Sequence, residues 1–379
     1  MKRLPLILLC LLLTAAPVLA LEPAPPEAVC IAAPSAILME KTTGTVLYEK
    51  DACAHLSPAS VTKLMTMLLV AEALDAGTLR PEDTVTASAR AASMGGSQIW
   101  LEEGEEMTVD EMLKCVAVVS ANDCCVALAE HLAGSEEAFV RRMNDRAEEL
   151  GLTDTHFTSC SGLTDSDDHY SCARDLALIS RELLLHPRIK TYTTVWMDSI
   201  RDGEFGLSNT NKLIYYYPGA TGLKTGYTAK AGYCLSASAE RDGIEFIAVV
   251  LHVPTSTERF ESAKALLSFG FANYALLSPE GRVTLPPVPV TLGAAETVQP
   301  VLPEDCGVLT EKSAAAKPEF RWELPERIAA PVEAGEEIGT LSVYAGEALL
   351  REVPLLAGES VPRLGFFSRL RLLLNALWC

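Results

Sequence analysis

Basic residues are scarce in this chain of 379 residues, where 31 lysines and arginines stand against 50 aspartates and glutamates, giving a formal charge of −19. Proteins that bind nucleic acid through its phosphates need a cationic face, so this balance argues against a nucleic-acid partner. Charged residues make up only 21% and hydrophobic residues 49% of the chain. That composition suits a folded core and excludes extensive disorder. The length alone predicts two domains.

The chain also lacks several patterns that mark common kinds of site. It has six histidines but no G-x-S-x-G nucleophile elbow, which disfavours a histidine-based catalytic triad. No spacing of cysteines and histidines matches a zinc site, so neither a metal nor another cofactor is expected. Eleven cysteines in so long a chain do not imply a disulfide scaffold. No repeat of the solenoid type is present.

The first twenty residues have the three parts of a secretory signal peptide. A basic start is followed by the apolar run Leu4–Leu13 and then by small residues that end at Ala20. The apolar run is about half as long as a bilayer-spanning helix, which disfavours the alternative of an N-terminal membrane anchor. We expect cleavage after Ala20, with residues 21–34 as a linker. The mature protein is then expected to work outside the cytoplasm.

The last twenty residues, 360–379, contain three arginines and no acidic residue. On a helical wheel that starts at Phe366, the apolar residues fall in an arc of roughly 140° and arginines flank it. The segment is too short and too charged to span a bilayer. It predicts an amphipathic helix lying in the plane of the membrane surface, which would attach the protein to the outer face of the cell membrane. The alternative is a helix that docks on the protein's own C-terminal domain.

Between these ends, residues 35–277 alternate between strand and helix patterns and predict an α/β (α+β) domain. A hairpin is expected at 35–49, because two alternating runs flank a Thr-Gly turn. The expected helices are a buried one at 64–70 and others within 107–133, 139–150 and 259–271. Further strands are expected at 233–238 and 245–251.

Residues 281–357 are rich in valine, proline and glutamate, with short alternating runs separated by turn residues. This pattern predicts a small all-β domain of sandwich type. The expected strands include Val283–Leu285, Phe320–Leu324 and Gly339–Tyr344.

Three short patterns in the first domain carry catalytic residue types, and each occurs once in the chain. They are Ser60-Val-Thr-Lys63 before the buried helix, Ser120-Ala-Asn122 in a helical region, and Lys224-Thr-Gly226 at the opening of a strand. Each pattern alone has a structural explanation, such as a helix cap or a solvated lysine. The three together, in this order, are typical of serine acyl transferases with an S-x-x-K nucleophile.

Physical chemistry gives each residue a role. Residues three apart share a helix face, so Lys63 is expected beside Ser60. A serine hydroxyl needs a base to take its proton, and a lysine can be that base when burial and a nearby cation, here Lys224, lower its pKa. Ser120 can relay a proton between Lys63 and the leaving amine. Asn122 can orient Lys63 and the substrate amide.

The Lys224–Gly226 strand offers an edge on which an extended peptide can lie. Gly226 is expected to let that peptide backbone approach closely. The predicted chemistry is acyl transfer through an ester on Ser60.

With these motifs the sequence resembles the serine-type D-Ala-D-Ala carboxypeptidases, the low-molecular-mass penicillin-binding proteins of peptidase family S11, over essentially its full length. The resemblance implies a penicilloyl-serine transferase domain of the β-lactamase-like fold, followed by a small β domain and often by an amphipathic anchor. The matching segments are residues 58–66, 95–97, 120–123, 156–157, 162–163, 219–228 and 231–233.

By this resemblance Ser60 is the acylated nucleophile and Lys63 its base, with Ser120 and Asn122 completing a proton relay. The sequence departs from the family at Ser159-Cys160-Ser161, where Asn-Pro is usual, and at Cys124-Cys125, where small alanines are usual. We expect the adjacent cysteines to pack in the core as small hydrophobic residues. A Cys160–Cys172 bridge is compatible with the sequence but nothing in the sequence supports it.

The resemblance also implies a set of substrate contacts. Lys224 and Thr225 would contact the terminal carboxylate of the substrate, and the backbone N–H groups of Ser60 and Tyr227 would form the oxyanion hole. Arg259 resembles a family arginine that helps to hold the carboxylate. The alternative for Arg259 is a surface helix residue.

The expected function is removal of the terminal D-alanine from peptidoglycan stem peptides during cell-wall synthesis and shaping, with β-lactam antibiotics as covalent inhibitors. A β-lactamase is one alternative, although the E-x-x-L-N loop of such enzymes is absent from the sequence. A DD-endopeptidase shares every catalytic residue and stays open. A catalytically idle cell-wall scaffold has no need for Lys63 or Lys224.

Overall fold

The structure is a computed structural model that describes residues 21–303, 306–313 and 318–365. The described chain forms two compact units, with the first spanning Leu21–Leu276 and the second beginning at Leu277. The predicted signal peptide, residues 1–20, lies outside the described residues, and so do residues 366–379 of the amphipathic helix predicted at 360–379. The predicted start of that helix is wrong, because Val361 and Arg363 form β-bridges with Val332 and Gly293. Among the described helices, none combines the length and apolar character that a membrane crossing requires.

A five-stranded antiparallel sheet in the order β2-β1-β9-β8-β7 organises the first unit. Its strands are β1 (Ser35–Glu40), β2 (Val46–Lys50), β7 (Ala220–Thr228), β8 (Gly232–Arg241) and β9 (Ile244–Val253). Strand β9 lies in the middle and is almost wholly buried, because helices cover both faces of the sheet. Strand β7 is the last strand on its side, so its outer edge has no neighbouring strand within the described residues.

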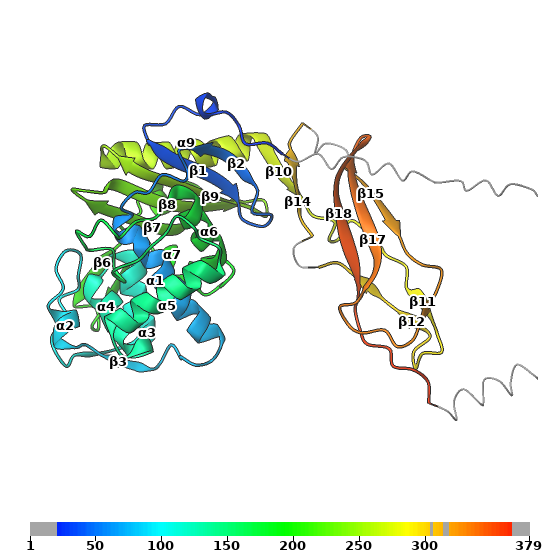
Figure 1. Ribbon diagram of the computed structural model, residues 1–379, viewed down its shortest axis with the longest axis horizontal. Coiled ribbons are helices and arrows are strands. Elements are labelled where there is room, and N and C mark those ends of the chain that lie inside the picture. Colours follow the sequence, from blue (N-terminus) through cyan, green and yellow to red (C-terminus); the bar gives the residue numbers. More distant parts are fainter. Residues whose placement is uncertain (1–20, 304–305, 314–317, 366–379) are drawn as a thin grey trace, which may run out of the picture. The chain divides into compact units, whose positions relative to one another are not determined.

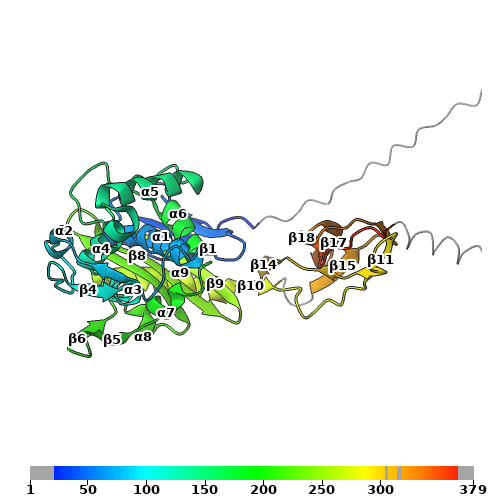
Figure 2. The ribbon, with the colours of Figure 1, turned by 90° about the horizontal axis from the view of Figure 1, so that it is seen from below.

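The long helix α9 covers one face of the sheet, and a group of helices built around α1 covers the other (Figures 1 and 2). The helices are α1 (Lys63–Asp75), α2 (Ala89–Ala92), α3 (Val109–Val118), α4 (Asn122–Ala133), α5 (Glu136–Glu149), α6 (Ala173–Leu183), α7 (Ile189–Thr193), α8 (Leu213–Tyr216) and α9 (Ser256–Asn273), with short 3-10 turns η1 (Pro26–Ala28) and η2 (Ala59–Thr62). Two ribbons complete the unit, β3 (Thr84–Thr86) with β4 (Glu106–Thr108) and β5 (Met197–Ile200) with β6 (Phe205–Ser208). Strand β10 (Tyr274–Leu277) follows α9.

Helix α1 is buried along most of its length because its residues are apolar on all sides. It packs against α3, α4, α5 and α6 inside one continuous hydrophobic core. This placement confirms the buried helix expected at 64–70 and makes α1 the rigid support for the residue that opens it, Lys63. The hairpin β1–β2 and the strands β8 and β9 were also predicted correctly.

The helical region expected at 107–133 is instead two helices, α3 and α4, which is a correction to the sequence interpretation. A capping box, in which Thr108 and Glu111 bond reciprocally, starts α3. The helix ends at Val118, because Ser120 adopts a left-handed backbone with φ of 66°. The backbone N–H of Asn122 then donates to the Ser97 carbonyl at 2.7 Å and not to a carbonyl of the preceding helix.

The second unit is all-β, as the sequence predicts. One sheet has the order β12-β11-β16 and another the order β13-β18-β17-β15. The strands are β11 (Val288–Thr291), β12 (Thr297–Val298), β13 (Pro300–Val301), β14 (Val308–Glu311), β15 (Pro318–Glu323), β16 (Ile328–Ala329), β17 (Glu337–Ala345) and β18 (Ala348–Ala357).

The strand expected at Val283–Leu285 is absent from this unit, and the first strand begins at Val288. Two prolines stand between them, and a proline has no N–H to give to a strand ladder. Val283 and Leu285 nevertheless pack against the hydrophobic cluster around Leu341. Their apolar side chains therefore contribute to the core although they are not in a strand.

Candidate active site

The S-x-x-K pattern lies where η2 passes into α1. Ser60 is in η2 and is half-buried, so its hydroxyl remains reachable, whereas Lys63 opens α1 and is fully buried. The Lys63 Nζ lies 3.0 Å from the Ser60 Oγ, which is the contact expected from the three-residue spacing. The residue before the serine, Ala59, has a strained positive φ of 47°, a conformation that neighbouring contacts must hold in place.

Two further oxygens bind the Lys63 amine. Its Nζ donates to the Asn122 Oδ1 at 2.6 Å and to the backbone carbonyl of Ser161 at 2.8 Å. Burial lowers the pKa of Lys63. The side-chain oxygen of Asn122 and the carbonyl of Ser161 can only accept hydrogen bonds. A neutral amine therefore donates its two N–H groups to these two oxygens. Its lone pair is then left for the proton of Ser60.

The S-x-N pattern forms the turn between α3 and α4. Asn122 binds Lys63 directly, whereas the Ser120 hydroxyl, although buried, makes no hydrogen bond to Lys63 within the described residues. The relay role of Ser120 therefore stays a prediction. The Asn122 Nδ2 also donates to the Gly95 carbonyl at 2.7 Å. One asparagine side chain therefore binds both Lys63 and the loop around Gly95.

Asp123 holds this loop in place, and the sequence interpretation gave it no role. Its buried carboxylate accepts from the backbone N–H groups of Ile99 at 3.0 Å, Leu101 at 3.1 Å and Cys124 at 2.9 Å. A carboxylate with several backbone donors is well stabilised without a cation. An acidic residue directly after the S-x-N was the available signal, because a buried aspartate needs partners of this kind.

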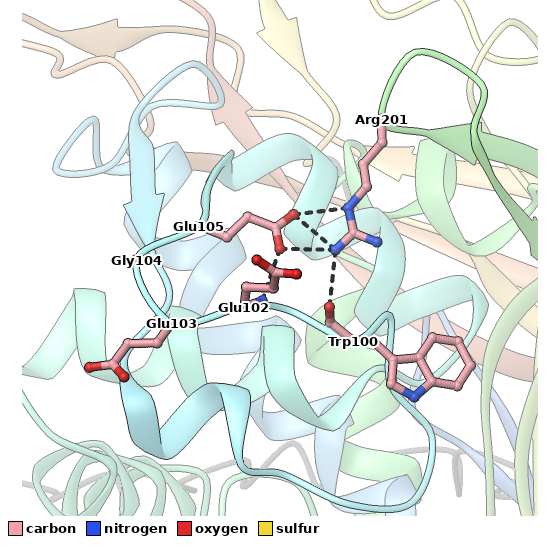
Figure 3. Close-up of a pocket in the computed structure, with 6 residues that line it drawn as sticks. All are labelled: Trp100, Glu102, Glu103, Gly104, Glu105 and Arg201. Carbon is pink, nitrogen blue, oxygen red and sulfur yellow. Dashed lines mark hydrogen bonds and ion pairs between the residues drawn. The ribbon is translucent and has the colours of Figure 1, made fainter.

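The outer end of the same loop is tied to the β5–β6 ribbon, as Figure 3 shows. The Arg201 guanidinium donates to the Glu105 carboxylate at 2.9 Å and to the Ile99 carbonyl at 2.9 Å. Arg201 and Glu105 line a pocket rimmed by acidic side chains, together with Trp100, Glu102, Glu103 and Gly104. Asp123 therefore fixes the loop from inside the domain and Arg201 from outside.

The K-T-G pattern lies within the edge strand β7 rather than at its opening. The Lys224 Nζ is fully buried and donates to the Thr225 carbonyl at 3.1 Å, while the Thr225 Oγ1 donates to the Thr210 Oγ1 at 2.7 Å. At Gly226 an added Cβ would lie 2.7 Å from the Pro58 carbonyl and 3.1 Å from the Ser60 amide. The glycine thus lets β7 approach the segment that carries Ser60, and its expected role toward the substrate backbone stays a prediction.

Arg259 and Tyr227 flank this strand. Arg259 is 7% exposed, so the surface-residue alternative is wrong. Its guanidinium donates to the carbonyls of Gly226 at 3.2 Å and Cys234 at 3.4 Å, which support β7 and β8, and its Nε has no partner. Tyr227 is 55% exposed, and its ring packs against that of Tyr233 in a tilted arrangement with centroids 4.4 Å apart.

Lys63, Lys224 and Arg259 bring three basic side chains together in this region. Burial, followed by the charges of Lys63 and Arg259, sets the pKa of Lys224 well below its usual value, and burial lowers the pKa of Arg259 to about 10. Lys224 was expected to lower the pKa of Lys63, but burial is the leading cause there. Among the described residues no carboxylate forms an ion pair with any of the three. The region can therefore accept an anionic group from outside.

A loop that the motifs did not identify completes the site. The Ser161 carbonyl binds Lys63, and next to it Gly162 has φ of 75°. An added Cβ at Gly162 would lie 1.9 Å from the Ala59 carbonyl, so only glycine fits against the strained residue beside Ser60. The Gly-Leu pair at 162–163 was part of the family resemblance, but a backbone carbonyl that binds a lysine leaves no residue-type signal in a sequence.

Buried His169 supports the nucleophile segment from the other side. The Thr158 N–H donates to its Nδ1 at 3.0 Å, so the proton sits on Nε2, which donates to the Thr62 Oγ1 at 2.8 Å. Burial lowers the pKa of His169 to about 4. His169 in the folded protein is therefore neutral at pH values above about 4.

With this geometry described, comparisons with known proteins decide the family. A family model for D-alanyl-D-alanine carboxypeptidase, Peptidase S11, matches residues 21–255, and a model for the C-terminal domain of penicillin-binding protein 5 matches residues 280–363. The chain belongs to the D-alanyl-D-alanine carboxypeptidase family. It is a serine peptidase with a penicilloyl-serine transferase fold and a C-terminal all-β domain, as the sequence resemblance implied.

Its relatives cover nearly the whole chain. It is 44% identical over 346 residues to D-alanyl-D-alanine carboxypeptidase DacF of Bacillus subtilis, an alignment that covers 89% of this chain and 88% of that protein. It is 33% identical to DacC of Escherichia coli over 90% of this chain and 88% of that one. The crystal structure of penicillin binding protein 5 from Haemophilus influenzae superposes with a TM-score of 0.74 at 30% identity, covering 90% of this chain and 100% of that one.

Gly226→Ala tests the close approach of β7 to the nucleophile segment. We expect the rate of covalent labelling by a fluorescent penicillin to fall roughly 100-fold, because a displacement of about 1 Å at a reacting group costs that much. Gly206→Ala, in the open space beside strand β6, is the matched control and should label like the wild type. Equal labelling rates for Gly226→Ala and the wild type would show that β7 need not approach Ser60 so closely.

His169 predicts an acid-sensitive fold. Its folded pKa of about 4 lies below the unfolded value of 6.5, so between these pH values the unfolded chain binds more protons and stability is lost as pH falls. The loss from this group reaches about 2 kcal/mol by about pH 5. Urea unfolding at a series of pH values measures it, and His169→Gln should show a flatter dependence over the same window. The same slope in both proteins would mean that His169 does not cause the acid sensitivity.

Proposed function

We propose that this protein is a serine-type D-Ala-D-Ala carboxypeptidase that removes the terminal D-alanine from peptidoglycan stem pentapeptides through an acyl-enzyme on Ser60. One observation carries the proposal. The Ser60 hydroxyl contacts a buried lysine whose other partners can only accept hydrogen bonds, next to cations that lack an ionic partner. The first feature supports acyl transfer and the second supports recognition of a free carboxylate.

In the acylation step the Ser60 Oγ attacks the carbonyl carbon of the penultimate D-alanine while its proton passes to the Lys63 Nζ. The substrate lies along the free edge of β7, where an extended peptide adds as a further strand. The backbone N–H groups of Ser60 and Tyr227 stabilise the oxyanion of the tetrahedral intermediate. Gly226 supports this arrangement by keeping β7 close to the Ser60 amide.

Collapse of the tetrahedral intermediate breaks the peptide bond and needs a proton on the leaving amine. Lys63 holds the proton taken from Ser60, and the buried Ser120 hydroxyl is the relay that passes it on. Asn122 keeps the lysine in place through its 2.6 Å hydrogen bond. D-Alanine leaves, and the shortened peptide stays attached to Ser60 as an ester. Water then attacks the ester, Lys63 takes a proton from that water, and the Ser60 hydroxyl is restored.

Recognition of the substrate's end follows from charge. The terminal carboxylate of D-Ala-D-Ala pairs with Lys224 and the hydroxyl of Thr225, and the charge of Arg259 behind the strand adds to the attraction. The Arg259 guanidinium acts through β7, because it donates to the Gly226 carbonyl. A DD-endopeptidase acts on the same bond type and is the second candidate, since no strand in the described part of the chain pairs with the outer edge of β7, where a cross-linked peptide would lie. The unpaired cations favour the carboxypeptidase.

β-Lactam antibiotics are expected to acylate Ser60 in the same way, because their ring amide and carboxylate present the same two groups to the serine and to Lys224. We expect slow hydrolysis of the β-lactam ester, since the sequence lacks the E-x-x-L-N loop that β-lactamases use for rapid deacylation. A catalytically idle scaffold would not need a lysine whose burial lowers its pKa beside a reachable serine.

We also propose that the mature protein is exported and held on the outer face of the cell membrane. The support lies in the sequence alone, namely the basic and apolar residues 1–20 with their small-residue end and the amphipathic residues 366–379. A cell-wall substrate requires this location. The arginines of the C-terminal segment complement an anionic membrane surface, which would repel the acidic remainder of the chain.

The decisive assay is release of D-alanine from a diacetyl-Lys-D-Ala-D-Ala peptide and of D-alaninamide from its C-terminal amide. We expect release from the free acid and a kcat/KM roughly 10- to 100-fold lower for the amide, because hydrogen bonds to a charged group are lost. Ser60→Ala should release none and should not be labelled by a fluorescent penicillin. No release from the free acid by the wild type, or persistent labelling of Ser60→Ala, would overturn the proposal.

Removal of residues 366–379 should free the mature protein from membranes without changing hydrolysis of a soluble peptide. The cut must leave Val361 and Arg363 in place, since Val361 is buried in the second unit and Arg363 donates to the Ala330 carbonyl. A full-length Leu373→Asp/Leu374→Asp variant is the matched control and should also be released. Sedimentation of the truncated protein with membranes would contradict the anchor.

A further inference from the structure

Two cysteines lie directly behind the Lys63 amine. Cys125 is on α4 and Cys160 is in the loop that ends at Gly162, and both are fully buried. Their sulfur atoms are 3.8 Å apart, and the Cys125 Sγ also donates to the Cys160 carbonyl at 3.2 Å. The acylation mechanism uses neither thiol. Among the described cysteines all are free, so this pair is reduced in the structure.

Each cysteine is coupled to a partner of Lys63. Cys125 follows Asn122 by one helical turn, and Asn122 accepts from the Lys63 amine. Cys160 precedes Ser161, whose carbonyl accepts from the same amine. The Cys160 carbonyl in turn accepts from the Thr66 hydroxyl on α1 at 2.6 Å, so the loop is fastened to the helix that Lys63 opens. A change in the distance between the two sulfurs would therefore alter the hydrogen bonds from the Lys63 amine to Asn122 and to Ser161.

The two thiols differ in acidity. Burial alone would raise the pKa of Cys125, but the hydrogen bond with Cys160 and the charge that Lys63 carries when it is protonated bring that pKa below its usual value. The pKa of Cys160 is raised well above its usual value by the hydrogen bond to Cys125 and by burial. The thiolate is the reactive form of cysteine, which makes Cys125 the attacking sulfur.

We propose that Cys125 and Cys160 form a reversible disulfide that weakens acylation of Ser60 by displacing Lys63, an inference that rests on the proposed function. The oxidant is a disulfide-bonded thiol compound or oxidoreductase. The Cys125 thiolate attacks one oxidant sulfur and expels a thiolate, and the Cys160 sulfur, on losing its proton, attacks Cys125 and expels the second. Two protein thiols lose two electrons and two protons, and the oxidant gains them as two thiols. Because both thiols are buried, exchange takes place during folding or local opening of the 159–162 loop.

The direction of the effect follows from the geometry. A disulfide bond is about 2 Å long, so the sulfurs must approach each other by nearly half of their present separation. The bond also removes the thiol hydrogen that Cys125 gives to the Cys160 carbonyl. Closing this gap shifts the loop at Ser161, next to Cys160, and α4 at Asn122, one turn before Cys125. The Lys63 amine then loses the alignment with Ser60 that those two oxygens impose.

Other described cysteines near this pair have different partners. Cys172, which the sequence left open as a partner for Cys160, instead caps α6 by accepting from the Asp175 N–H. Cys124 is next to Cys125 in the chain but interacts with Cys115 on α3. It therefore supplies a matched control, a buried cysteine one residue away whose replacement leaves the Cys125–Cys160 pair intact.

The test refolds and incubates the mature protein in glutathione buffers of increasing oxidised fraction, then maps disulfides by mass spectrometry of unreduced digests and measures the rate of labelling by a fluorescent penicillin. We expect a peptide containing Cys125 linked to one containing Cys160, and a labelling rate that falls at least about tenfold and returns with dithiothreitol. Cys160→Ala and Cys125→Ala should keep a constant rate across the series. Cys124→Ala should respond as the wild type does.

Two outcomes overturn the inference. Absence of the Cys125–Cys160 linkage under all buffers would show that the pair does not oxidise. A linkage that leaves the labelling rate unchanged would show that it does not act on Lys63. A reduced protein that is not labelled at all would instead contradict the proposed function, while the mapped linkage would still report on the cysteine pair.

Discussion

The proposed chemistry depends on one constraint, which is that the amine of Lys63 is buried among three oxygens and works as a neutral base. Burial lowers its pKa, and the Asn122 and Ser161 oxygens take its N–H bonds so that the lone pair is directed at Ser60. An exposed lysine would keep its proton, and a buried lysine with fixed carboxylate partners would also keep it. The neutral acceptors are thus as important to the chemistry as the burial itself.

Much of the surrounding fold serves to bring those oxygens to one point. The buried helix α1 fixes the lysine, the left-handed turn at Ser120 delivers Asn122, and the loop that ends at Gly162 delivers the Ser161 carbonyl. Asp123 holds a further loop in register through three backbone donors. The edge strand β7 completes the site from the opposite side. Each of these parts comes from a different section of the chain, so the hydrophobic core around α1 is what keeps the distances constant.

The residues whose roles follow from their own side-chain chemistry could be predicted from the sequence, and so could the elements with strong periodicity. The Ser60–Lys63 contact follows from helical spacing, and the buried helix α1 from its apolar run. What escaped prediction depends on the backbone or on long-range packing. The break between α3 and α4 is invisible to periodicity, because both halves are apolar. The Ser161 carbonyl carries no residue signature. The true neighbour of Gly226 is a segment more than a hundred residues earlier in the chain.

The most direct test of the central claim is to measure the ionisation of Lys63 by NMR of the protein with ¹⁵N-labelled lysine side chains, titrated from about pH 6 to about pH 11. The account predicts a side-chain signal that titrates below the ordinary lysine value of about 10.4 and that disappears in Lys63→Met. A second shifted signal should disappear in Lys224→Met. If the signal lost in Lys63→Met titrates at the ordinary value, Lys63 is not the neutral base and the account is wrong.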